Sequence, residues 1–235
     1  MSEQQLYRLG AISGIVGGVL ALVFNLLHPR LGDFSDPVSE DLRVAAQSDA
    51  WTLIHVGVTA GVLLLIAALY VVARSLREDG AGYRLGRLAL GSLVISAPVG
   101  LVTLAIDGYA TKYVADLVAG GGPLAAGQAV AAIGWAVFMF FVIMLLGVTP
   151  ALFGAAIAAS DDYPAVLGWP AVVLGFGSIV AGLIGYFGGP SAGFFLVFMI
   201  TSGLLTVWVI ALGVVLWRRS ADVPDRAATP VRPTA

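Results

Sequence analysis

The strongest constraint in this sequence is its series of long, uncharged apolar segments. The most informative one runs from Leu88 to Asp116, where an apolar stretch of membrane length passes without a break into charged residues. A helix needs ~20 predominantly apolar residues to cross the ~30 Å hydrocarbon layer of a bilayer. This segment therefore predicts a transmembrane helix whose outer end continues beyond the bilayer.

The composition extends this conclusion to the whole chain. Of its 235 residues, 59% belong to the AVILMFWYC set and only 11% are charged, whereas soluble domains average about 45–50% apolar residues with glycine included and about 25% charged residues. The net charge of −2 offers no basic surface to a nucleic acid. With no cysteine in the sequence, disulfides, thiolate metal sites and cysteine nucleophiles are excluded.

The apolar segments predict an all-α bundle of six transmembrane helices with a helical hairpin extension outside the bilayer. We expect these helices over residues 9–27, 51–72, 88–119, 124–159, 166–187 and 192–217, and a short surface helix over residues 42–46. The fourth helix, at 1.5 Å per residue, would measure roughly 54 Å. The third and fourth helices therefore form the hairpin, with Tyr109, Tyr113 and Leu117 expected to face residues 124–131. Residues 1–219 make up the transmembrane domain, and the polar, proline-containing residues 220–235 a disordered cytoplasmic tail.

The distribution of basic residues predicts the orientation of the chain. In a six-crossing model, one side carries Arg8, Arg74, Arg77, Arg84, Arg87, Arg218 and Arg219, and the other carries Arg30, Arg43 and Lys112. The positive-inside rule then places both termini in the cytoplasm. We expect a multi-pass protein of the cell membrane in contact with the lipid bilayer. A second copy of the chain or a membrane partner subunit is a further possible neighbour, and nucleic acid is not.

Two of the predicted helices carry a stripe of small and polar residues along one face. The stripes are Ser92, Ser96, Gly100, Thr103 and Asp107 in the third helix and Gly14, Gly18, Ala21, Asn25 and His28 in the first. Such faces turn toward other helices, because small residues permit close backbone approach and hydroxyls need partners that lipid does not supply. Each stripe ends in a side chain capable of chemistry, His28 or Asp107.

Six crossings bring the end of the first helix, the start of the second and the outer end of the third to the same side. These ends carry His28, His55 and Asp107, with Asn25 and Lys112 close by in the sequence. The five residues form our candidate polar cluster, since ionisable groups at membrane depth are functional hypotheses by default. The alternative is structural hydrogen bonding between helix ends. The sequence favours this structural interpretation, because all three helix ends lie within reach of water and headgroups, where polar side chains cost little.

Three classes of function remain. A non-enzymatic packing or interaction subunit comes first, because no catalytic constellation is complete and no motif of a known enzyme family occurs. A small transporter comes second, with Pro98 and Pro150 as helix discontinuities. A haem-binding or metal-dependent membrane enzyme built on His28, His55 and Asp107 comes third. The sequence assigns no metal or cofactor.

Overall fold

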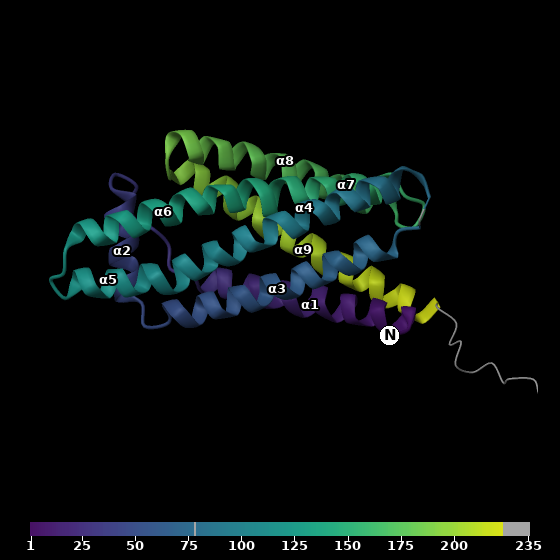
Figure 1. Ribbon diagram of the computed structural model, residues 1–235, viewed down its shortest axis with the longest axis horizontal. Helices are drawn as coiled ribbons and strands as arrows, with labels where there is room; N and C mark the ends of the chain where they lie inside the picture. The colour runs from purple at the N-terminus through teal and green to yellow at the C-terminus, as the bar shows by residue number, and fades with distance from the viewer. Residues whose placement is uncertain (78, 223–235) are drawn as a thin grey trace, which may run out of the picture.

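The protein is an elongated bundle of helices that lie roughly along one axis (Figure 1). The computed structural model describes residues 1–77 and 79–222, and this part of the chain contains helices and connecting loops without a β-strand. Six of its helical segments are long and apolar enough to cross a membrane. The predicted all-α membrane bundle is confirmed.

The helices follow the predicted order closely. Their bounds are α1 Glu3–Leu27, α2 Pro37–Gln47, α3 Trp51–Ser75, α4 Gly80–Ala105, η1 Ile106–Thr111, α5 Lys112–Ala119, α6 Leu124–Ile143, η2 Met144–Val148, α7 Thr149–Ala158, α8 Ala165–Gly188 and α9 Ala192–Asp222. The segments η1 and η2 are π-helical turns inside two long helices, Gly80–Ala119 and Leu124–Ala158. The expected starts at residues 9 and 88 are several residues late, because the helices continue through the charged residues beyond the apolar part.

The hairpin extension is present. The two long helices contain 40 and 35 residues, or ~60 and ~52 Å at 1.5 Å per residue, against ~30 Å of hydrocarbon. In Figure 1, α5 and the start of α6 extend past the end of α3, and α2 lies across them. We call this part of the bundle the hairpin end, and the opposite part, where α1 begins and α9 finishes, the terminal end.

The contacts inside the hairpin differ from the prediction. Tyr109 and Tyr113 do not face α6: they are 70% and 62% exposed and stack on each other with ring centroids 6.5 Å apart. The buried residues of α5 are Val114 and Ala115, which cluster with the apolar face of α2. The prediction was wrong because it treated the hairpin as two isolated arms, whereas α2 covers them.

The helix α2 is longer than expected and begins earlier. The Asp36 side chain accepts a hydrogen bond from the Ser39 backbone N–H at 3.2 Å, and Pro37 occupies the first turn. These are the residues that favour a helix start, because the cap satisfies a free N–H and proline has none to satisfy. The apolar face of α2, with Leu42 and Ala45, is buried against the hairpin.

Glycine permits the closest helix packing near the terminal end. A Cβ added at Gly168 of α8 would overlap the Gly154 carbonyl of α7 and lie 2.6 Å from the Ala158 backbone nitrogen. A Cβ added at Gly82 of α4 would lie 2.9 Å from the Ser160 Cα and 3.0 Å from the Ala156 carbonyl oxygen of α7. Backbones in direct contact leave no space between these helices, which is the packing expected of small residues in membrane helices.

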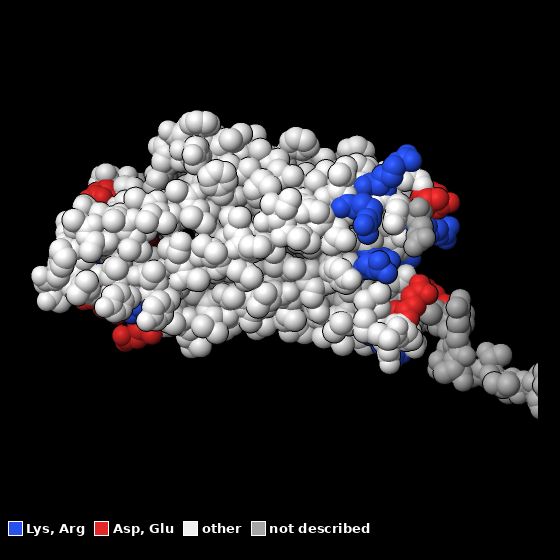
Figure 2. Space-filling model, viewed as in Figure 1, with Lys and Arg blue, Asp and Glu red and all other residues white. Residues whose placement is uncertain are grey.

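Charged side chains lie at the two ends of the bundle. Figure 2 shows Lys and Arg gathered at the terminal end and a broad middle belt without charge on the face in view. This distribution fits a bilayer around the belt, since charge is costly in hydrocarbon. Residues 223–235 of the expected tail lie outside the described residues, and residues 220–222 complete α9.

Candidate functional site

Two imidazoles meet at the hairpin end of the bundle. His28 follows the last residue of α1 and His55 lies one turn into α3, and their Nε2 atoms are 3.3 Å apart. The rings are nearly perpendicular, with centroids separated by 4.9 Å. Trp51 packs against both, at 5.0 Å from His28 and 4.9 Å from His55, and is itself 1% exposed. The tryptophan therefore fixes both rings from one side.

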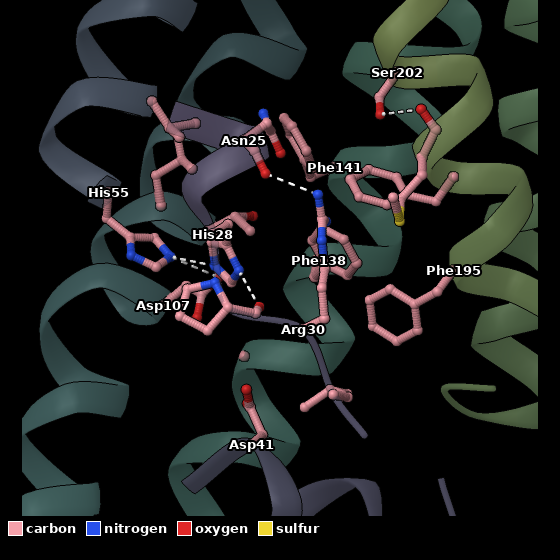
Figure 3. A pocket seen from close by; sticks show the side chains of 18 of the residues that line it. Asn25, His28, Arg30, Asp41, His55, Asp107, Phe138, Phe141, Phe195 and Ser202 are labelled. Atoms are coloured by element: carbon pink, nitrogen blue, oxygen red, sulfur yellow. Dashed lines mark hydrogen bonds and ion pairs between the residues drawn. The ribbon is translucent and has the colours of Figure 1, made fainter. Parts of the chain in front are cut away.

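The second nitrogen of each ring is bonded to a backbone carbonyl. His28 Nδ1 lies 2.7 Å from the Pro29 oxygen, and His55 Nδ1 lies 2.8 Å from the Trp51 oxygen. A carbonyl oxygen only accepts hydrogen bonds, so Nδ1 carries the proton and donates in both rings. In the neutral rings both Nε2 atoms present lone pairs, and they point toward each other (Figure 3). Two lone pairs at this distance need a proton or a cation between them.

Asp107 supplies the negative charge beside the imidazoles. Its Oδ2 lies 3.1 Å from His55 Nε2, and its side chain is 36% exposed. The ligand atoms of His28, His55 and Asp107 all lie within 4.8 Å of one another. The structure thus brings together three of the predicted residues, from the three helix ends that the sequence analysis indicated.

The π-helical turn η1 holds Asp107 against α3. The Trp51 indole N–H donates to the Asp107 carbonyl at 2.7 Å, and the Thr52 hydroxyl donates to the Gly108 carbonyl at 3.3 Å. A Cβ at Gly108 would lie only 2.5 Å from the Cβ of His55, so glycine is needed for this approach. π-Helical turns occur frequently at functional sites, where the extra residue redirects a side chain.

The other two predicted residues have different roles. Asn25 is partly buried and lines the same cavity as the histidines, and its backbone carbonyl accepts a hydrogen bond from Arg30 Nη2 at 2.9 Å. Lys112 lies outside the cluster, with its Nζ 2.7 Å from Asp116 Oδ1 and 3.3 Å from the Ala46 carbonyl oxygen. It ties α5 to α2, and it forms an ion pair with Asp116 one turn along the helix.

The cluster opens into a cavity of about 450 Å³ between α1, α3, α4, α6 and α9. Pockets of ~300–1,000 Å³ are typical of small-molecule sites. The wall facing the imidazoles is aromatic, as Figure 3 shows for Phe138, Phe141 and Phe195. These rings pack against one another, with Phe138 6.0 Å from Phe141 and 5.1 Å from Phe198 between ring centroids.

Two charged residues of the cavity were missed from the sequence. Arg30 follows α1, and Asp41 projects from α2 toward the cluster (Figure 3). Burial and, as the second cause, the nearby Asp107 carboxylate together raise the pKa of the Asp41 carboxyl to about 7. A helical pattern identifies Asp41, because it lies one turn before the buried Ala45 and thus on the covered face of α2. For Arg30 the sequence contains no comparable signal.

Comparison of the chain with protein-family models, with curated proteins and with solved structures gives no match. The site must therefore be interpreted from its own geometry.

Proposed function

We propose that this chain is a metal-dependent membrane enzyme in which His28, His55 and Asp107 bind one zinc ion facing the cavity. The observation that carries the proposal is the convergence of two Nε2 lone pairs and a carboxylate on one point. The leading expectation from sequence, a non-enzymatic subunit, rested on the lack of a complete constellation. It remains a prediction, and the convergence of these ligand atoms is the observation that supports the enzyme proposal beside it.

The distances fit a tetrahedral zinc ion. Two Zn–N bonds of ~2.05 Å at a tetrahedral angle hold the nitrogens ~3.3 Å apart. The Nε2 atoms of His28 and His55 are separated by 3.3 Å, and the Asp107 oxygen lies 3.1 Å from His55 Nε2. The third distance, between the ligand atoms of His28 and Asp107, is at most 4.8 Å. A small rotation of the partly exposed Asp107 side chain would shorten it to the separation that a zinc ion requires.

The surroundings of the imidazoles also match those of metal ligands. A histidine that binds a metal almost always donates its other ring N–H to a carbonyl or carboxylate, which fixes the ring and raises its basicity. His28 and His55 both do so. A bis-histidine haem fits less well, because an iron bound on opposite sides by ~2.0 Å bonds separates the nitrogens by ~4 Å, with a macrocycle between the rings.

The ligand set points to hydrolytic chemistry. Catalytic zinc sites use three protein ligands and keep the fourth position for water, whereas structural sites use four. Here the structure offers two nitrogens and one oxygen, and the remaining side of the cluster faces the cavity. Zinc lowers the pKa of its bound water to ~7, which provides a hydroxide nucleophile at neutral pH.

Metal analysis of the purified protein tests this proposal. We expect one zinc per chain after reconstitution of protein carrying no histidine tag, and the visible bands of tetrahedral cobalt after replacement of zinc by Co²⁺. His55→Gln and Asp107→Asn should each weaken zinc binding by at least ~10-fold, since each removes a ligand. The matched control is Asp116→Asn, which removes a carboxylate of the same helix that lies outside the cluster.

Circular dichroism of each variant separates loss of metal from loss of fold. Unchanged zinc content in a folded His28→Gln/His55→Gln double variant would overturn the proposal. So would a wild-type protein that takes up no zinc or cobalt.

We also propose that the hairpin end lies outside the cell and that both termini are cytoplasmic. The excess of arginine at the terminal end supports this orientation through the positive-inside rule. The site would then lie in the outer half of the membrane, close to the headgroups.

Cysteine labelling tests the orientation, because the chain has no thiol of its own. In intact cells, Ser35→Cys and Asp49→Cys at the hairpin end should react with an impermeant maleimide. Asp79→Cys, at the terminal end, should react only after lysis. The reverse pattern would invert the model.

A further inference from the structure

We infer that the cavity binds a single-chain acyl lipid, with its carbonyl at the His28–His55–Asp107 cluster and its chain along the phenylalanine wall. The identity of the reacting group rests on the proposed function. The binding of the chain does not, because it follows from the shape and the polarity of the cavity.

The cavity is long and parallel to the helices. Along α3 its lining extends from His55 through Val58 and Val62 to Leu65, which is ten residues or ~15 Å at 1.5 Å per residue. Along α9 the lining extends from Ala192 to Thr206, which at the same rise is ~21 Å. A narrow space along the bundle axis fits one extended chain better than a compact solute.

The polarity changes along this axis as it does along a lipid. All the charged side chains of the described lining, Arg30, Asp41 and Asp107, lie at the hairpin end with the two imidazoles. The deeper lining consists mainly of Val, Leu, Phe and Met side chains. A ligand with one polar end and one apolar end therefore matches the cavity in the orientation that a lipid has in its own leaflet.

The hydroxyl groups in the deeper part of the cavity already have hydrogen-bond partners and need none from a ligand. Thr103 donates to the Val99 carbonyl at 2.9 Å, Thr206 donates to the Ser202 carbonyl at 2.8 Å, and Ser202 donates to the Met199 carbonyl. Because each is bonded within its own helix, the walls present carbon to the cavity. This surface favours a hydrocarbon chain, whose burial is driven by the hydrophobic effect.

The charges at the hairpin end favour a carbonyl or carboxylate head. With zinc bound, the cation and Arg30 together outweigh Asp107 and Asp41 by one positive charge. Arg30 is a fitting partner for such a head, since its guanidinium donates to planar carboxyl groups with two N–H bonds. In Figure 3 the Arg30 side chain lies between the imidazoles and the phenylalanines, where the head of a bound chain would meet its tail.

The reaction that this geometry supports is hydrolysis of the acyl bond. The oxygen of water forms a bond to the carbonyl carbon, and the bond from that carbon to the leaving oxygen or nitrogen breaks. The leaving group takes one proton of the attacking water, the other proton passes to solvent or to an amine leaving group, and a fatty acid carboxylate is released. The product carboxylate is therefore a suitable probe of the site.

Binding is measured with 2-bromododecanoic acid, whose bromine lies next to the head group and quenches tryptophan on contact. Trp51 and Trp135 line the cavity, and lipid-facing Trp169 and Trp217, which are 61% and 51% exposed, are replaced by Phe to lower the background. We expect saturable quenching by 2-bromododecanoic acid in zinc-loaded protein, and by the uncharged 2-bromododecanol in metal-free protein, where Asp107 and Asp41 would repel a carboxylate. Arg30→Gln should weaken the quenching by the acid ~10-fold but not the quenching by 2-bromododecanol, since one charge-assisted hydrogen bond is lost.

A matched pair of variants tests the cavity itself. Val62→Phe fills the middle of the cavity and should weaken binding of the acid at least ~10-fold, because a close-packed site has no room for both groups. Leu63→Phe adds a ring at the neighbouring position, which is 48% exposed to lipid, and should leave binding unchanged. Equal quenching in both variants, or quenching that never saturates, would overturn the inference.

Zinc content separates this inference from the proposed function. Val62→Phe should still bind one zinc per chain, because Val62 is about two turns from His55. Saturable lipid binding without any zinc uptake would contradict the enzyme proposal alone. Zinc uptake without lipid binding would contradict the acyl lipid alone.

Discussion

The two ends of the bundle contain similar charged and aromatic residues in different environments. At the terminal end, Arg219 lies over the rings of Tyr163 and Tyr7 at 4.7 and 5.3 Å, and Asp162 pairs with Arg77 at 3.1 Å. At the hairpin end, Arg30, Asp41, Asp107 and two histidines line a cavity. Charged and aromatic groups thus pack against one another at the terminal end, whereas at the hairpin end they line a cavity.

The difference follows from how closely the helices approach. Near the terminal end, glycine contacts such as Gly168 on Gly154 bring backbones together and leave no volume between them. At the hairpin end, the phenylalanines of α6 and α9 hold those helices away from the histidines of α1 and α3. The comparison predicts that substitutions in the close-packed half mainly change stability, whereas substitutions around the cavity mainly change the proposed binding.

The largest loss of stability is expected from a substitution in the close-packed half of the bundle. Gly168→Ala should lower the free energy of unfolding by about 3 kcal/mol, because the new Cβ overlaps a backbone carbonyl that cannot turn aside. Thermal unfolding in detergent measures this loss. Gly91→Ala is the control, since a Cβ there meets nothing within 4 Å and alanine favours a helix. An equal loss in both variants would show that the close contact is unimportant.

A smaller effect on stability is expected at the hairpin end, where the effect on metal binding is larger. Gly108→Ala forces η1 away from His55 and should cost ~2 kcal/mol of stability. By displacing Asp107 it should also weaken zinc binding ~10–100-fold. Gly203→Ala, with no atom within 4 Å of the added Cβ, is the control for both measurements. Normal zinc affinity in Gly108→Ala would show that Asp107 is not a ligand.

The last prediction concerns Asp41 at the hairpin end, whose effect on stability should depend on pH. Because burial raises the pKa of Asp41 from 3.8 to about 7, the folded protein favours its neutral form, and the ionised form destabilises the fold as pH rises through that interval. In metal-free protein, Asp41→Asn should therefore raise stability at ~pH 8, where the carboxyl must ionise, and have little effect at ~pH 4, where it is largely neutral in the folded protein. A gain of equal size at both pH values would contradict this account of Asp41.

The sequence predicted the transmembrane helices well, because hydropathy over twenty residues is a strong signal. It also predicted that His28, His55 and Asp107 converge, since the number of crossings alone decides which helix ends meet. Lys112 was included because it follows Asp107 closely in the sequence, and it instead bonds to the Ala46 carbonyl of α2. The covering of the hairpin by α2 was not predictable from local pattern.

The cavity could not be predicted for a different reason. Phe138 and Phe195 belong to helices far apart in the sequence, and an aromatic residue facing a cavity has the same local pattern as one facing lipid. The π-helical turns were likewise outside what periodicity reveals. Pro150 was recognised as a break, and η2 lies directly before it, where the missing proline N–H leaves a carbonyl without its usual partner. The region around Pro98 stays α-helical, and η1 begins at Ile106.

The order of these residues along the chain has a consequence for biosynthesis. His28, His55 and Asp107 all precede residue 120, whereas Phe138 and Phe195 follow it. A chain emerges from the ribosome with its N-terminal part first, so the ligands are made and inserted as a group before either phenylalanine exists. The residues of the proposed metal site are therefore in place before α9 is made, and α9 then adds Phe195 to the wall of the cavity.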